Sequence, residues 1–270
     1  YSISELQAAG YTNTELGTLG YTLTEFADIS RNVVLSDWVI QKQISNEIFE
    51  YVEFSNGIFI AVSKTHYKKY LYSSESGNEW NKSEIDNEYK IYKSVAYGNS
   101  KWISIHDNKV ATSIDGSTWN ISQTNLSDYF YSIAFGNSIF VAIIGSPIQK
   151  YLATSNDGIN WVIQTTPVNL NWTSIIYGNE IFVVVANDGT TGDIITSNDA
   201  ITWTQQVTPS GNYYWKDITY GNNLFVVSGN GILTSEDSIT WSIQENTENE
   251  SWTSIASVSY THLRAHETLQ

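Results

Sequence analysis

The sequence predicts an all-β protein, a β-propeller of four-stranded blades with a short α-helical repeat segment in front of it. Two observations carry this prediction. The phrase TSNDGINW, Thr154 to Trp161, recurs with variations along the chain, and between its copies lie alternating β-forming residues separated by turn residues. A repeat of about 40 residues is typical of a propeller blade, a sheet whose two apolar faces only neighbouring sheets can cover. The tryptophans that mark this repeat are Trp38, Trp80, Trp119, Trp161, Trp203 and Trp241.

The composition excludes several classes of function. The 270 residues carry a formal net charge of -15 at pH 7 and contain no cysteine. Nucleic-acid binding requires clustered Lys and Arg, so nucleic acid is not expected as a partner, and no membrane insertion is expected either. Without cysteine there is no disulfide, no thiolate metal site and no Cys nucleophile.

Both ends of the chain differ from the propeller in composition. Residues 1–30 read YSISELQAAG, YTNTELGTLG and YTLTEFADIS, in which Ser or Thr stands three residues before Glu as in a helix capping box. These units resemble the ELKAAGY-type decapeptide repeats of bacterial and viral proteins, which implies a short helical spacer. Residues 258–270 begin with VSYTHLRAHET, which resembles the translation of a sequencing adapter, and we expect them to be a non-native tail.

The remaining part, residues 31–257, is predicted to be a C-terminally truncated propeller. One unit illustrates its strands, which are Trp172–Tyr177, Ile181–Ala186, Asp193–Ser197 and Trp203–Val207. Gly178-Asn179 is interpreted as the first hairpin turn, because both residues tolerate positive φ. An aromatic residue after this turn is expected to face a neighbouring blade, and it recurs as Phe59, Trp102, Phe140, Phe182 and Phe225.

Both ends of the repeat region carry part of a further blade. Trp38–Gln43 matches a fourth strand but has no earlier strands before it, and Ser251–Ala256 supplies a first strand only. We predict that these two segments belong to one closing blade, which gives at least five whole blades plus the composite one, six or more in total.

The recurring aspartates are predicted to be structural. Asp115, Asp157, Asp199 and Asp237 can accept hydrogen bonds from the N–H groups of a turn, with the preceding serines assisting. The TSxDGxxW units resemble the Asp-box, or BNR-like, repeats of sialidase-type propellers from Asp37 to Ala256, although one residue fewer separates Asp from Trp. The resemblance implies that the motif occupies the turn between the third and fourth strands and that the tryptophan fills space between blades.

Catalysis is disfavoured. As the resemblance implies, sialidases hold the substrate carboxylate with three arginines, and outside the predicted tail this chain has only Arg31. A glycoside hydrolase needs two carboxylates, and Asp217 with another channel carboxylate such as Glu53 is the alternative hypothesis. His66 and His106 have no partner at metal-ligand spacing, and the Asn187–Asp193 loop lacks the EF-hand register, so neither a metal nor a cofactor is expected.

Aromatic and polar residues precede several first strands and would gather on one face. The candidate ligand-binding residues are Tyr131, Trp172, Tyr214, Trp215 and Asp217. Aromatic rings beside neutral polar groups suit sugar rings or protein loops. The sequence thus favours a non-enzymatic binding or adhesion module for a glycan or protein, a monomeric fragment of a larger protein located outside the cell or on a cell or virion surface. An assembly factor like the photosystem II stability propellers is disfavoured by the near absence of Arg.

Overall fold

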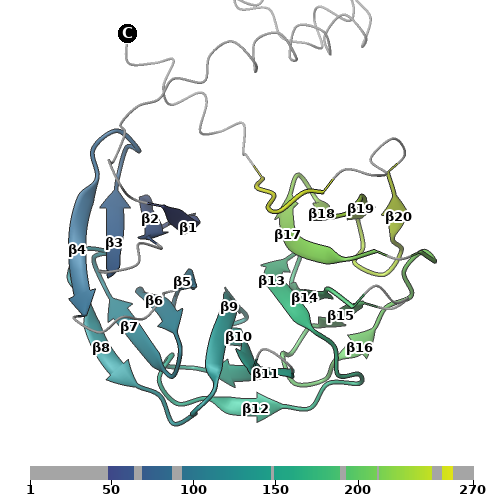
Figure 1. The fold of residues 1–270 in the computed structure, drawn as a ribbon, viewed down its shortest axis with the longest axis horizontal. Helices are drawn as coiled ribbons and strands as arrows, with labels where there is room; N and C mark the ends of the chain where they lie inside the picture. The colour runs from purple at the N-terminus through teal and green to yellow at the C-terminus, as the bar shows by residue number, and fades with distance from the viewer. Residues whose placement is uncertain are drawn as a thin grey trace, which may run out of the picture. The chain divides into compact units, whose positions relative to one another are not determined.

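Five four-stranded antiparallel sheets make up the described part of the chain in the computed structural model (Figure 1). The described residues are 48–63, 69–86, 93–146, 149–188, 193–211, 213–244 and 251–257, all in the unit that begins at Ser45. They contain no helix. The predicted helical repeats of residues 1–30, the tail of residues 258–270 and the segment Trp38–Gln43 lie outside them.

Each sheet consists of four strands that follow one another in the chain, and we call the sheets blades 1 to 5. Blade 1 contains β1 (Phe49–Ser55), β2 (Ile58–Ser63), β3 (Lys69–Ser74) and β4 (Asn81–Asp86). Blade 2 contains β5 (Ser94–Gly98), β6 (Lys101–His106), β7 (Lys109–Ser113) and β8 (Asn120–Gln123). Blade 3 contains β9 (Tyr129–Gly136), β10 (Ile139–Gly145), β11 (Lys150–Ser155) and β12 (Val162–Gln164). Blade 4 contains β13 (Trp172–Gly178), β14 (Ile181–Ala186), β15 (Ile194–Ser197) and β16 (Thr204–Gln205). Blade 5 contains β17 (Trp215–Gly221), β18 (Leu224–Gly229), β19 (Ile232–Ser235) and β20 (Ser242–Ile243).

The blades are arranged as the propeller prediction requires. The first strands β1, β5, β9, β13 and β17 lie toward the centre and the fourth strands lie at the periphery (Figure 1). Each first strand contacts the first strand of the next blade. The fourth strand of blade 4 is shorter than predicted, since β16 covers Thr204–Gln205 rather than Trp203–Val207.

The core lies between blades, in four clusters that each join two successive blades. Between blades 3 and 4, for example, Val141 and Ile143 pack with Phe182 and Val184, and all four side chains are fully buried. The aromatic residue after each first hairpin is fully buried in such a cluster in blades 2 to 5, as predicted; these residues are Trp102, Phe140, Phe182 and Phe225.

Four repeat tryptophans pack in the inter-blade clusters, namely Trp119, Trp161, Trp203 and Trp241, whereas Trp80 lies against Phe59 of its own blade. Trp161, Trp203 and Trp241 are buried, whereas Trp80 and Trp119 are half-buried. In all five, the indole N–H donates to the backbone oxygen three residues earlier at 2.8 to 3.3 Å. This bond satisfies the polar group of the indole, so the ring can fill apolar space at little cost.

The first hairpin differs from its prediction in one respect. The turn residues are Asn179 and Glu180, with φ of 50° and 62°, whereas Gly178 is paired with Ile181 inside the ladder. Two consecutive positive φ values are typical of a type I′ turn. The glycine is needed for another reason, because a Cβ on Gly178 would lie 2.4 Å from Cγ of Tyr220 in the next blade.

This close approach recurs around the propeller. Phe135 lies against Gly98 and Tyr177 lies against Gly136 in the same way. The hydroxyl of Tyr177 also donates to Oδ1 of Asn137 at 2.6 Å. Each of these rings therefore lies across the hairpin of the preceding blade and sets the spacing between the two sheets.

The segment Ser251–Ser257 lies along β17 without forming a ladder. Ser257 meets Gly221 where Tyr220 meets Gly178, and the Trp252 N–H donates to the Gly229 oxygen at 2.7 Å. The segment therefore holds the position of a sixth first strand, although the closing blade as a whole stays a prediction.

On blade 1, the face that blades 2 to 5 turn toward a preceding blade is partly exposed. Phe49 and Val52 are 41% and 57% exposed, whereas their counterparts in blade 4, Trp172 and Ile175, are buried.

Replacing Gly136 by Ala tests the glycine contact. The added Cβ would lie 2.1 Å from Cγ of Tyr177, close to the root of that side chain, so the two blades must move apart. We expect the free energy of unfolding to fall by about 1–3 kcal/mol in urea denaturation. In the control Gly231→Ala, the nearest atom lies at 3.5 Å; here we expect no loss and a gain of up to about 1 kcal/mol. Equal effects of the two variants would contradict the contact.

Candidate functional site

The acidic turns of the repeat hold their own backbone. Oδ1 of Asp157 accepts hydrogen bonds from Ser155 Oγ and from the N–H groups of Ile159 and Asn160, at 2.8 to 3.0 Å. Ser155 Oγ in turn accepts from Gly158 N at 2.8 Å. The Asp bonds recur at the three other acidic turns, which all lie between a third and a fourth strand; their aspartates are Asp115, Asp199 and Asp237.

These hydrogen bonds stabilise the ionised form of each aspartate. The backbone N–H groups of Thr202 and Ile201 lower the pKa of Asp199 to about 2, and those of Thr240 and Ile239 lower the pKa of Asp237 to about 2. The pKa of Asp157 is also lowered, although burial opposes this. A carboxylate held in this way shapes a turn and is a poor general acid or base near neutral pH.

The variant Asp237→Asn tests this role through the dependence of stability on pH. Because the folded-state pKa is depressed, the ionised Asp237 stabilises the fold above about pH 4, and this contribution is lost as the pH falls toward 2. We expect the variant to melt at a lower temperature than the parent at pH 7, with the difference shrinking between pH 4 and pH 2. Glu236→Gln, which changes the exposed neighbouring carboxylate, is the control. A pH-independent difference, or one shared by the control, would contradict the role.

Asp217 joins β13, β17 and the segment Ser251–Ser257. It lies at the ladder position that Ser94, Ser132 and Ser174 occupy in other blades. Oδ1 accepts from Ser174 Oγ at 2.9 Å and Ile218 N at 3.0 Å, and Oδ2 accepts from Ser254 Oγ at 2.8 Å and Ile255 N at 3.0 Å. Both carboxylate oxygens of Asp217 therefore accept hydrogen bonds from protein donors, and those to Oδ2 hold the segment Ser251–Ser257 against β17.

Glu53 has a similar local partner set on β1. Tyr51 donates its hydroxyl to Oε2 and Ser55 donates its hydroxyl to Oε1, both at 3.3 Å. Burial raises the pKa of Glu53. Burial also raises the pKa of Tyr51, and the charges of Glu53 and Asp217 add to this effect, so the structure brings Tyr51 within electrostatic reach of both carboxylates. Tyr51 occupies the ladder position equivalent to Asp217, a relation that the irregular sequence of β1 did not reveal.

The predicted aromatic face lies at the end of the blades where the first strands begin. The structure divides its residues into two groups. The indoles of Trp172 and Trp215 are 0% and 1% exposed, so they support the face from inside and cannot stack on a ligand. Tyr129 and Tyr214 are 52% and 46% exposed and Tyr131 is half-buried. We call Tyr129, Tyr131 and Tyr214 the tyrosine face.

Hydrogen bonds and a ring stack fix the loops that present Tyr129 and Tyr214. The Tyr214 N–H donates to Oδ1 of Asn230 at 2.7 Å, and the ring of the neighbouring Tyr213 stacks on Trp215 with centroids 5.2 Å apart. Tyr129 pairs with Gly145 at the end of the β9–β10 ladder. The rings therefore start from ordered backbone, which lowers the entropic cost of binding.

A lysine that the sequence argument missed lies beside this face. Lys150 Nζ donates to the backbone oxygen of Trp172 at 2.8 Å and lies 4.3 Å from the centroid of the Tyr131 ring. Burial lowers the pKa of Lys150, with an opposing effect of Asp188 and a further lowering by Lys93. The only sequence feature that could have indicated Lys150 is its position at the start of a strand, in the run QKYLATS.

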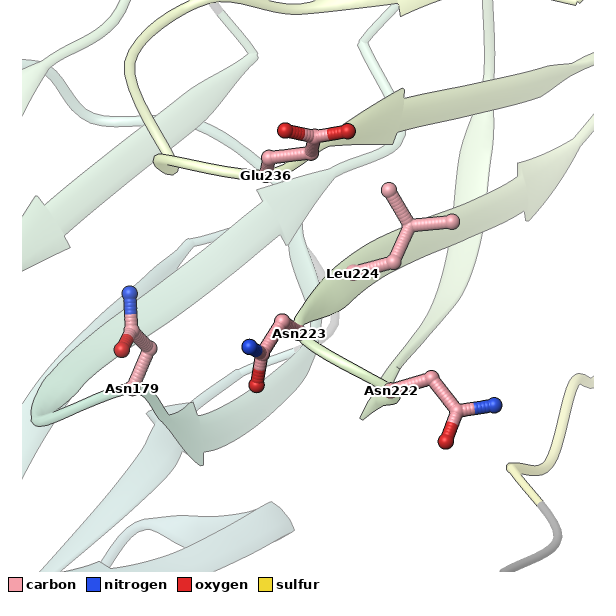
Figure 2. Close-up of a pocket in the computed structure, with 5 residues that line it drawn as sticks. All are labelled: Asn179, Asn222, Asn223, Leu224 and Glu236. Atoms are coloured by element: carbon pink, nitrogen blue, oxygen red, sulfur yellow. The ribbon is translucent and has the colours of Figure 1, made fainter.

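A hollow of about 460 Å³ lies at the opposite end of blades 4 and 5, lined by Asn179, Asn222, Asn223, Leu224 and Glu236 (Figure 2). In blades 2 and 3 the corresponding hairpin residues, Asn99 and Asn137, donate to the acidic turn of the next blade at 3.0 and 2.7 Å. Asn179 makes no such bond within the described part of the chain. The hollow is thus explained by one missing bridge between blades.

The described residues contain no cluster of three or more potential metal ligands. His106 is buried with Nδ1 3.8 Å from a carboxylate oxygen of Asp107, and His66 lies outside the described residues. None of the described residues forms a helix long and apolar enough to cross a membrane.

Comparison with known proteins supports the fold alone. No protein-family model and no curated protein sequence matches the chain. Among solved structures, YCF48 bound to D1 peptide is similar over 75% of this chain and 68% of its own, with a TM-score of 0.55 and 17% identity. An inactive virginiamycin B lyase from Staphylococcus aureus with quinupristin is similar over 74% of this chain and 71% of its own, with a TM-score of 0.61 and 12% identity. A chain of a nidogen/laminin complex is similar over 77% of this chain and 84% of its own, with a TM-score of 0.55 and 11% identity. These neighbours are β-propellers, so the chain has a propeller fold.

Proposed function

We propose that this propeller is a non-catalytic module that binds a segment of another protein on the tyrosine face. The observation that carries the proposal is the pair of exposed rings, Tyr129 and Tyr214, which start from hydrogen-bonded backbone at the end of the blades where the first strands begin. Tyrosine is enriched in protein interfaces because it gives a large contact area with few rotatable bonds and a hydroxyl that can form a hydrogen bond.

The chemistry of the carboxylates supports binding rather than hydrolysis. A glycosidase requires one carboxyl group that protonates the leaving group and a second that acts as base or nucleophile. Asp217 has both oxygens engaged, and the four repeat aspartates hold turns. The alternative hydrolase built on Asp217 would therefore have to break the contact between β17 and Ser251–Ser257.

A protein ligand is favoured over a glycan. Sugar rings stack on flat aromatic faces, and the two indoles predicted for this role, Trp172 and Trp215, are buried. Two structures of similar fold are complexes with a peptide or protein, namely YCF48 bound to D1 peptide and the nidogen/laminin complex. Their identity to this chain is low, so they support the kind of ligand and not its sequence.

Binding of displayed peptides tests the proposal. The full chain is screened against a surface-displayed library of random dodecapeptides, and the recovered peptides are titrated against Tyr129→Ala and Tyr214→Ala. We expect each variant to weaken binding about tenfold or more, as expected for buried aromatic anchors. Ile239→Ala is the control, because Ile239 is 62% exposed at the opposite end of blade 5.

Two outcomes would contradict the proposal. One is the recovery of no peptide that binds the parent chain. The other is binding that the tyrosine variants leave unchanged. Binding on a glycan array that is lost in the tyrosine variants, without peptide binding, would favour the glycan.

A further inference from the structure

Lys150 is a buried cation with an incomplete set of partners. The residue is 9% exposed, and its ammonium group has three N–H donors. Within the described residues it makes one hydrogen bond, to the backbone oxygen of Trp172, and one cation–π contact, with Tyr131. Buried charges are normally paired with a counter-charge, because an unpaired one loses its hydration without compensation.

The nearest acidic group does not supply that pair. Asp188 is close enough to affect Lys150, but no ion pair joins them among the described residues. One oxygen of Asp188 accepts the backbone N–H of Asn171, which fixes the loop in front of Trp172. The ammonium therefore retains two donors at the edge of the tyrosine face.

A second lysine increases the positive charge at this place. Lys93 stands directly before β5, the first strand of blade 2, which contacts β9 in blade 3. In blade 3, Tyr129 at the start of β9 and Lys150 at the start of β11 both pair with Gly145, so both lysines lie at the end of the sheets that carries the tyrosine face. Lys93 also contributes to the lowered pKa of Lys150. Two lysines at the same end of neighbouring blades repel each other, and an anion bound between them would relieve this repulsion. Such a site stands out in a chain with a formal net charge of -15.

We propose that Lys150 and Lys93 anchor one carboxylate of the protein segment that binds the tyrosine face. This inference rests on the proposed function and adds the chemistry of the ligand, which is an acidic side chain or a C-terminal carboxylate next to a residue that contacts Tyr129 or Tyr131. The carboxylate would take the two free donors of Lys150. The backbone oxygen of Asp107 accepts the N–H of Phe130 in β9, and a carboxylate oxygen of Asp188 accepts that of Asn171 in front of Trp172. The nearby carboxylates of these two residues favour a ligand with a single negative charge over a polyanion such as a phosphate cluster.

The test uses the full chain and three matched sets of octapeptides derived from those recovered with the library. The first set carries Glu at one position, the second carries Gln there, and both have acetylated N-termini and amidated C-termini. The third set has Gln with a free C-terminal carboxylate. Affinities are measured at low and at physiological salt for the parent, Lys93→Gln, Lys150→Gln and the control Lys101→Gln, whose Nζ donates to the Asp157 oxygen at the opposite end.

We expect the Glu set or the free-carboxylate set to bind the parent at least tenfold more tightly than the amidated Gln set, and whichever does so identifies the source of the carboxylate. Lys93→Gln should reduce this preference to threefold or less while its denaturation curve stays that of the parent, and Lys101→Gln should keep the preference. Lys150→Gln also removes the bond to Trp172, so Lys93→Gln keeps the test valid if Lys150→Gln fails to fold.

Equal binding of all three peptide sets would overturn the anchor, and so would a preference that survives in Lys93→Gln. If peptides bind the parent without a preference for a carboxylate and Tyr129→Ala abolishes this binding, the anchor is wrong and the proposed function stands. If no peptide binds the parent, both are wrong.

Discussion

The structure depends on the burial of apolar side chains between neighbouring sheets. A single blade such as blade 4 has a second strand, Ile181–Ala186, that is buried on both of its faces, and no isolated four-stranded sheet can achieve this. Burial of apolar area is the main favourable term in folding, so each blade is stable only against its neighbours. The apolar area is buried in the four inter-blade clusters. The partly exposed Phe49 and Val52 mark a face of blade 1 where the same pattern has no described neighbouring blade against it.

The recurring polar residues keep those sheets at a uniform spacing. In blades 2 to 5 an acidic turn follows the third strand, and its aspartate accepts hydrogen bonds from the backbone, so the following tryptophan enters the inter-blade layer from a fixed position. At the same end of the sheets, Asn137 donates to the acidic turn of the next blade and accepts from Tyr177. Because these groups form hydrogen bonds with one another, the repeat fixes the residues at this end of the blades. Side chains can vary at the other end, where the first strands begin. The tyrosine face and Lys150 lie there.

Much of the fold could be predicted from the sequence because the repeat records it directly. The spacing of Trp161 and Trp203 predicts blades, and the alternation in Trp172–Tyr177 predicts a first strand. Side-chain exposure was harder to predict. Trp172 was expected to meet a ligand, yet the right-handed twist and close packing of the sheets bury it, and pattern alone does not distinguish a ring on the surface from a ring one layer below. Gly178 looked like a turn residue, but its role comes from Tyr220, which is 42 positions later in the chain and meets it only in the folded structure.

The most direct test of the central claim is the free energy of unfolding of Trp161→Ala beside that of Val162→Ala, both measured in guanidinium chloride. Trp161 is 2% exposed and lies between blades 2 and 3, whereas Val162, its neighbour in the chain, is 64% exposed. If tryptophans hold the blades together, Trp161→Ala lowers the free energy of unfolding by about 3–5 kcal/mol, and Val162→Ala changes it by less than about 0.5 kcal/mol. Similar small effects of both variants would contradict the account.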